Sequence, residues 1–88
     1  MYSEQFKFEF NGSVADSERM AALGELFMLA ESKGVKRESF GGYVLKHTGA
    51  VEFWSYTPDL TKIVVSWLKV KVEASKINVH KPKYLRSA

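Results

Sequence analysis

The chain has 88 residues, a formal net charge of +3 and no cysteine. A chain of this length forms one domain and buries only about 60 to 65 per cent of its unfolded surface, so its core must be efficient. The absence of cysteine excludes disulfides, thiolate nucleophiles and thiolate metal sites. No apolar run approaches the roughly 18 residues of a membrane span, and the first residues lack the basic region of a signal peptide. We therefore expect a soluble, unprocessed, cytoplasmic protein.

The positive charge is concentrated at the C-terminal end. Four of the 13 basic residues lie from Ser75 onward, where there is no acid, so nine bases face ten acids in the rest of the chain. We expect a single domain over residues 1–81 and a short basic tail over residues 82–88.

The first third of the chain predicts a strand followed by a helix. Residues 6–10 alternate apolar and polar side chains, which is typical of a strand with one buried face. The helix is expected to run to about Ser32, because apolar residues recur at steps of three and four: Met20, Leu23, Leu26, Phe27 and Ala30. Ser13 or Asp16 is expected to cap its N-terminus, and Gly34 to supply the left-handed position after its C-terminus.

The middle of the chain predicts a β-hairpin. Residues 40–47 predict a strand weakened at Gly41 and Gly42, which either form a bulge or let another group approach the backbone closely. Residues 48–50 form the turn, and residues 51–56 return as a strand rich in β-branched and aromatic side chains.

A second helix and a last strand complete the pattern. Thr57, Pro58 and Asp59 form a strong helix start, with an N-cap hydroxyl, a proline at the first helical position and an acid near the positive end of the helix dipole. Residues 68–74 also alternate like a strand, but no Gly or Pro interrupts them, so we favour one helix to about residue 75. Residues 77–81 then predict the final strand.

The element order β-α-β-β-α-β predicts an α+β protein with the ferredoxin-like split βαβ plait. In that fold a four-stranded antiparallel sheet carries two helices on one face. The expected core is Phe6, Phe8, Phe10, Leu23, Phe27, Phe53, Ile63 and Trp67.

No motif for catalysis or cofactor binding is present. His47 and His80 are the only histidines and have no acids at a ligand-like spacing, so we expect both to be exposed near strand ends. There is no Gly-x-Ser-x-Gly motif, and the glycine pair is too short for a phosphate-binding loop. Acylphosphatases share the predicted plait, but the loop after the first strand carries Asp16 and no arginine before Arg19. We expect no enzyme, no catalytic residue, no metal and no cofactor.

The uncovered sheet face is the candidate binding surface. A two-layer plait leaves one sheet face open, and if Val51 and Phe53 face the helices, Trp54 and Tyr56 face outward. Trp and Tyr are favoured interface anchors. We therefore predict a non-catalytic protein-binding or regulatory module with a site at Trp54, Tyr56 and Tyr43. A homodimer is the simplest use of such a face, because a second copy would cover the exposed aromatic area.

Two alternatives stay open. A single-stranded nucleic-acid-binding plait would stack bases on Trp54 and Tyr56 and hold phosphates with four cations of the C-terminal end: Lys76, Lys81, Lys83 and Arg86. The first strand argues against this use, because its open face carries Lys7 and Glu9 instead of aromatic residues. The other alternative is a small inhibitor or adaptor of a larger enzyme, for example one encoded by a mobile element. No membrane partner is expected.

Overall fold

The structure is a computed structural model, and it describes residues 2–80. Along the chain the elements are β1 (Glu4–Phe10), α1 (Asp16–Ser32), a 3₁₀ turn (Arg37–Ser39), β2 (Phe40–Val44), β3 (Val51–Ser55), α2 (Pro58–Glu73) and β4 (Ile77–Val79). The last three strands are shorter than predicted, and the 3₁₀ turn was not predicted. The predicted tail, residues 82–88, lies outside the described residues. Between residues 2 and 80, no helix is long and apolar enough to cross a membrane.

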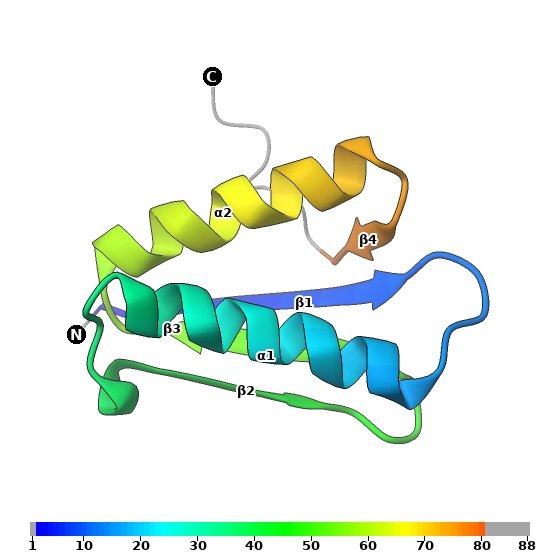
Figure 1. The fold of residues 1–88 in the computed structure, drawn as a ribbon, viewed down its shortest axis with the longest axis horizontal. Coiled ribbons are helices and arrows are strands. Elements are labelled where there is room, and N and C mark those ends of the chain that lie inside the picture. The colour runs from blue at the N-terminus through cyan, green and yellow to red at the C-terminus, as the bar shows by residue number, and fades with distance from the viewer. Residues whose placement is uncertain (1, 81–88) are drawn as a thin grey trace.

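The four strands form one antiparallel sheet in the order β2-β3-β1-β4. Each helix therefore connects two parallel strands that have another strand between them: α1 passes over β3, and α2 passes over β1. Figure 1 shows the two helices lying side by side. The predicted α+β class and the open antiparallel sheet with two helices are confirmed, and the arrangement is compatible with a plait.

Both helices pack against the same face of the sheet. Phe8 on β1 lies opposite Val51 on β3, and Phe53 stands two residues further along β3 on the same face. Phe27 of α1 contacts Phe53, with ring centroids 6.0 Å apart, and Trp67 of α2 contacts Phe8 at 5.6 Å. The opposite face of the sheet is therefore covered by neither helix.

Most of the predicted core is buried. Five of its members are buried, namely Phe6, Phe8, Leu23, Phe53 and Trp67, while Phe10, Phe27 and Ile63 are partly buried against the same cluster. The prediction that Met20 belongs to the buried stripe of α1 is wrong, because Met20 is 57% exposed. Ala22 is buried in its place. The buried stripe of α1 is turned toward Ala22 because α1 packs against α2 as well as against the sheet.

The N-terminus of α1 has no side-chain cap. Ala15 occupies the N-cap position, so the prediction that Ser13 or Asp16 caps this helix is wrong. The carboxylate of Asp16 instead accepts a hydrogen bond from Nη1 of Arg19 at 2.6 Å. The acid that could have capped the helix is thus held by a side chain one turn further on.

The C-terminus of α1 ends as predicted. Gly34 has a φ of +77°, in the left-handed region that glycine adopts without steric cost. Its N–H donates to the carbonyl of Glu31 at 3.0 Å, and the N–H of Val35 donates to the carbonyl of Ala30 at 3.1 Å. These two bonds form the Schellman pattern, and Val35 packs against the core.

The start and the length of α2 are also confirmed. Oγ1 of Thr57 accepts a hydrogen bond from the N–H of Leu60 at 3.2 Å, and Pro58 is the first helical residue. The helix continues to Glu73, through the residues whose alternation resembles a strand. Leu68 is fully buried whereas Val70 is 64% exposed, although the two would share one face of a strand.

The glycine pair of β2 makes close backbone approach possible and forms no bulge. The register with β3 is continuous from Phe40 opposite Ser55 to Val44 opposite Val51. A Cβ on Gly41 would lie 2.6 Å from Cε2 of Trp54, so only glycine leaves room for the indole.

Candidate functional site

The open face of the sheet consists of the side chains that alternate with the core. They are Gln5, Lys7 and Glu9 on β1, Gly41 and Tyr43 on β2, Glu52 and Trp54 on β3, and Asn78 on β4. The aromatic side chains of this face stand on β2 and β3, and β1 and β4 contribute polar ones.

Trp54 and Tyr43 form an aromatic pair on this face. The indole of Trp54 lies over Gly41, where a Cβ would be within 2.9 Å of three of its atoms. The two ring centroids are 5.9 Å apart with an interplanar angle of 61°, an edge-to-face arrangement. Tyr43 is 45% exposed. Two of the three predicted protein-binding residues are therefore held together by the fold.

Tyr56, the third predicted residue, lies beyond the end of β3 and is 43% exposed. Its N–H donates to the carbonyl of Ser39 at 2.9 Å, which extends the ladder between β2 and β3 by one residue pair. Among the described residues, the aromatic ring contact on this face is between Tyr43 and Trp54. Tyr56 therefore lies next to the aromatic pair and is not part of it.

Polar groups of both charges surround the aromatic pair. Lys7 lies directly opposite Glu52 in the register of β1 and β3. At the edge of the face, Nε2 of His80 is 2.6 Å from Oε2 of Glu9. The contact between Glu9 and His80 was not predicted from the sequence, because it requires β4 to pair with β1. The predicted plait places its first and last strands side by side, and that arrangement could have indicated the contact. His47 is exposed in the hairpin turn, as expected.

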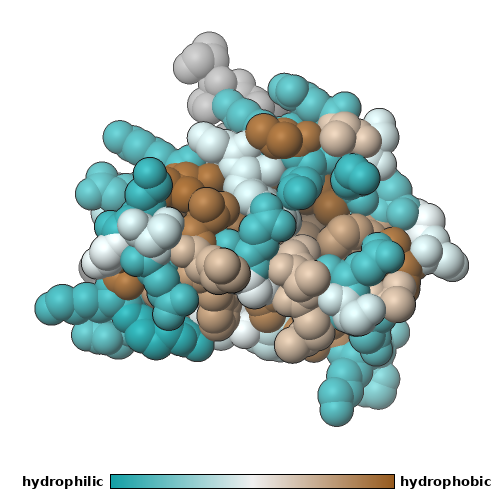
Figure 2. Space-filling model, in the orientation of Figure 1, coloured by the Kyte–Doolittle hydropathy of each residue, from teal (hydrophilic) through white to brown (hydrophobic). Residues whose placement is uncertain are grey.

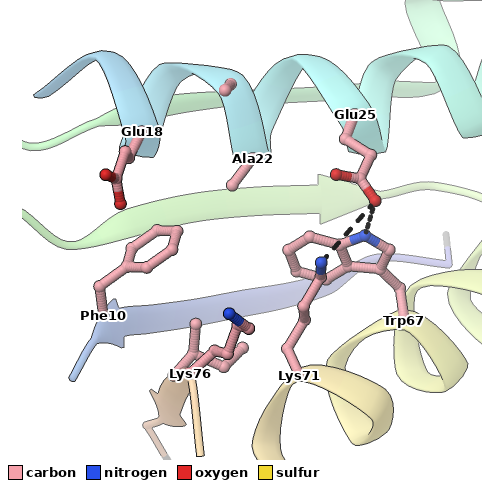
Figure 3. Close-up of a pocket in the computed structure, with 9 residues that line it drawn as sticks. Phe10, Glu18, Ala22, Glu25, Trp67, Lys71 and Lys76 are labelled. Carbon is pink, nitrogen blue, oxygen red and sulfur yellow. Dashed lines mark hydrogen bonds and ion pairs between the residues drawn. The ribbon is translucent and has the colours of Figure 1, made fainter. Parts of the chain in front are cut away.

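A groove of about 200 Å³ lies on the other side of the sheet, between α1 and α2 (Figure 3). Its apolar lining comes from Phe10, Ala21, Ala22, Trp67 and Ile77, and its charged lining comes from Glu18, Glu25, Lys71 and Lys76. Within the part of the chain that the structure describes, no cluster of three or more His, Cys, Asp or Glu side chains could hold a metal ion.

One side-chain cluster in the lining of this groove ties the two helices together. Nε1 of Trp67 donates to Oε1 of Glu25 at 2.9 Å, and Nζ of Lys71 lies 4.0 Å from the same oxygen and 5.3 Å from the centre of the Trp67 ring. Because Glu25 is about half exposed, the ion pair contributes little to stability, and the indole hydrogen bond is the stronger contact. The sequence does not indicate this cluster, since Glu25 and Trp67 are 42 residues apart.

Of the four cations predicted for nucleic-acid binding, the structure describes Lys76. Lys76 lines the groove on the helix side of the sheet, close to Phe10 (Figure 3). Lys81, Lys83 and Arg86 lie outside the described residues.

Figure 2 shows the helix-covered side, where hydrophobic groups form separate areas with hydrophilic groups between them.

Comparisons with protein-family models, with curated proteins and with solved structures found no match for this chain.

Proposed function

We propose that the protein is a non-catalytic protein-binding module that uses the open face of its sheet. The observation that carries this proposal is the pairing of Trp54 and Tyr43 on a face that neither helix covers. Because Gly41 and Tyr43 already hold the indole in place, binding a partner would cost little further side-chain entropy. Trp and Tyr also dominate the energetics of many protein interfaces.

The charges of the face favour a protein over a nucleic acid. Among the described residues, Glu9 and Glu52 stand on the same face as the aromatic pair, and the basic side chains there are Lys7 and, at the edge, His80. Two carboxylates oppose the approach of a phosphate backbone, whereas a protein partner can match mixed charges. Lys76, which would have to assist a nucleic acid, lines the groove on the helix side. A single-stranded nucleic acid therefore remains the alternative and not the preferred ligand.

The ferredoxin-like plait is part of this proposal. Its support is the strand order β2-β3-β1-β4, together with two helical connections that each skip one strand. This fold leaves one face of a two-layer protein free for a partner. Residence in the cytoplasm stays a prediction that rests on the lack of cysteine.

Selection from a random-peptide display library tests the proposal. The bait is the wild-type protein, and Trp54→Ala and Lys62→Ala are tested beside it; Lys62 is exposed on α2 and serves as the matched surface control. We expect selected peptides to shift the NMR signals of the Trp54 indole and the Gly41 amide. Trp54→Ala should weaken binding by about tenfold or more, while Lys62→Ala should leave it unchanged.

Titration with single-stranded RNA and DNA at two salt concentrations distinguishes the nucleic-acid-binding alternative from the protein-binding proposal. Binding of either polymer at the Trp54 indole, falling steeply as salt rises, would replace the protein-binding proposal with the nucleic-acid one. Peptides that bind equally well to wild type and Trp54→Ala would also overturn the proposal.

A further inference from the structure

The groove between α1 and α2 is separate from the proposed binding face, because the two lie on opposite sides of the sheet. Its volume of about 200 Å³ is below the roughly 300 to 1,000 Å³ of pockets for drug-sized ligands, so an occupant has to be small. The apolar side chains that α1 contributes to the lining are Ala21 and Ala22, and their small size leaves the space between the helices open.

The floor of the groove is apolar and is held in place by the core. Trp67 and Ile77 are buried, and Phe10 is partly buried against the same core cluster. The ring of Trp67 contacts Phe8 with centroids 5.6 Å apart, and its Nε1 donates to Oε1 of Glu25 at 2.9 Å. An apolar group that enters the groove therefore meets a preformed surface, and little side-chain entropy is lost on binding.

The charged side chains of the groove are separated by sign. Both acids, Glu18 and Glu25, stand on α1, whereas Lys71 stands on α2 and Lys76 in the turn that follows it. Glu25 and Lys71 already pair, with Oε1 and Nζ 4.0 Å apart. Among the described residues, no ion pair involves Glu18 or Lys76, although both line the same groove. Figure 3 shows these two side chains on opposite sides of the Phe10 ring.

We propose that this groove binds a free amino acid with an apolar side chain. A free amino acid is a zwitterion near neutral pH. Its ammonium group can approach the carboxylate of Glu18 while its own carboxylate approaches the ammonium group of Lys76. Its side chain then covers Phe10 and Trp67. Each charged group of the ligand meets an opposite charge, and the apolar group meets the apolar floor.

A ligand with a single charge fits this arrangement less well. An anion attracted by Lys76 also comes close to Glu18, and a cation attracted by Glu18 also comes close to Lys76, so each meets a like charge. An uncharged apolar molecule contacts the floor but gains nothing from either charged side chain. A small zwitterion is therefore the ligand class that both the charges and the floor favour.

NMR of the indole N–H groups tests the proposal, because the chain has two tryptophans and they lie on opposite sides of the sheet. L-Phenylalanine is the probe. Phenethylamine lacks its carboxylate, 3-phenylpropionate lacks its ammonium group, and N-acetylphenylalanine amide lacks both charges. We expect phenylalanine to shift the signal of Trp67 and to leave that of Trp54 in place. Each analogue should bind at least about fivefold more weakly.

Substitutions in the lining identify the residues that bind the ligand. Glu18→Gln and Lys76→Gln should each weaken the binding of phenylalanine by about fivefold. Glu73→Gln and Lys62→Gln, at exposed positions of α2 outside the lining, are the matched controls and should leave binding unchanged. Ala21→Leu should abolish binding, because a larger side chain fills part of the groove. This position is exposed and leucine is a good helix former, so the variant should fold.

Three results would each overturn the proposal. The first is a Trp67 signal that phenylalanine does not move. The second is an analogue that binds as tightly as phenylalanine, because the two charges of the ligand would then be irrelevant. The third is binding that survives Ala21→Leu, or a shift confined to Trp54, because the ligand would then lie outside the groove. Trp67 reports on the groove and Trp54 on the open face, so failure of this proposal is distinguishable from failure of the proposed function.

Discussion

Gly41 and Gly42 are neighbours in β2, but replacing each by alanine should have different consequences. A Cβ on Gly42 would lie 2.6 Å from the carbonyl oxygen of Glu52 and 2.7 Å from Cδ1 of Leu23. A Cβ on Gly41 would meet only the indole of Trp54 among its nearest atoms. The first obstacle is backbone in the middle of the sheet, whereas the second is a side chain that can rotate toward solvent.

The magnitude follows from these contacts. Ordinary contact begins at 3.4 Å, so the Glu52 carbonyl would have to retreat by about 0.8 Å from the Gly42→Ala methyl. Overpacking costs about 1 to 3 kcal/mol, and the weakened hydrogen bond between β2 and β3 adds about 1 kcal/mol. The lower entropy of the unfolded alanine chain returns about 0.4 to 1 kcal/mol. We expect Gly42→Ala to lower the free energy of unfolding by about 2 kcal/mol, which lowers Tm by roughly 8 to 16 °C.

For Gly41→Ala the same entropy gain offsets most of the indole contact that is lost, so stability should change by less than about 1 kcal/mol. The Trp54 indole should leave the sheet, and its N–H signal should move toward that of an exposed indole. Partner binding through the open face should weaken with it.

Denaturant unfolding followed by circular dichroism measures both variants beside the wild type, all at the same protein concentration. The NMR signal of the Trp67 indole serves as the internal reference, because this buried ring lies on the other side of the sheet. The reasoning is refuted if Gly42→Ala is as stable as its parent, or if Gly41→Ala is the less stable of the two.

Three further substitutions test local contacts. Thr57→Ala should lower the free energy of unfolding by about 1 kcal/mol through loss of the α2 cap, while Thr57→Ser should keep it; an unchanged denaturation midpoint in the alanine variant would contradict the cap. Glu25→Ala should shift the indole N–H signal of Trp67 and leave that of Trp54 in place, and two unmoved signals would exclude the hydrogen bond in solution. Gly34→Ala should cost about 1 kcal/mol in thermal unfolding because φ is +77° there, and a higher Tm would show that the helix end rearranges.

Predictions about the fold succeeded where the deciding information is local. The cap of α2 and the Schellman ending of α1 depend on a few adjacent residues, and both are present. The prediction of an α1 cap was wrong because two short polar side chains near the helix start could each act as the cap, and Asp16 bonds to Arg19 instead. The prediction that Met20 is buried was wrong because periodicity indicates that a helix has an apolar stripe but does not show how packing against a second helix rotates the buried face.

The candidate site was predictable only in part. Alternation along the hairpin predicted that Tyr43 and Trp54 lie on the open face. The structure further shows that their rings contact each other and that the indole of Trp54 lies over Gly41. The position of Lys76 beside the groove could not be predicted, because it depends on the turn between α2 and β4. The pairing of Glu9 with His80 likewise requires strands from opposite ends of the chain to become neighbours.

The sequence by itself determined which segments become helices and strands and which side of most of them is buried, because hydrophobic period, caps and turns act over a few residues. Only the tertiary structure decided that Trp54 rests on Gly41 and that Glu25 meets Trp67. These contacts join residues that are separated in the chain. They are selected by the packing of both helices on one face of the sheet, and no local pattern encodes that choice.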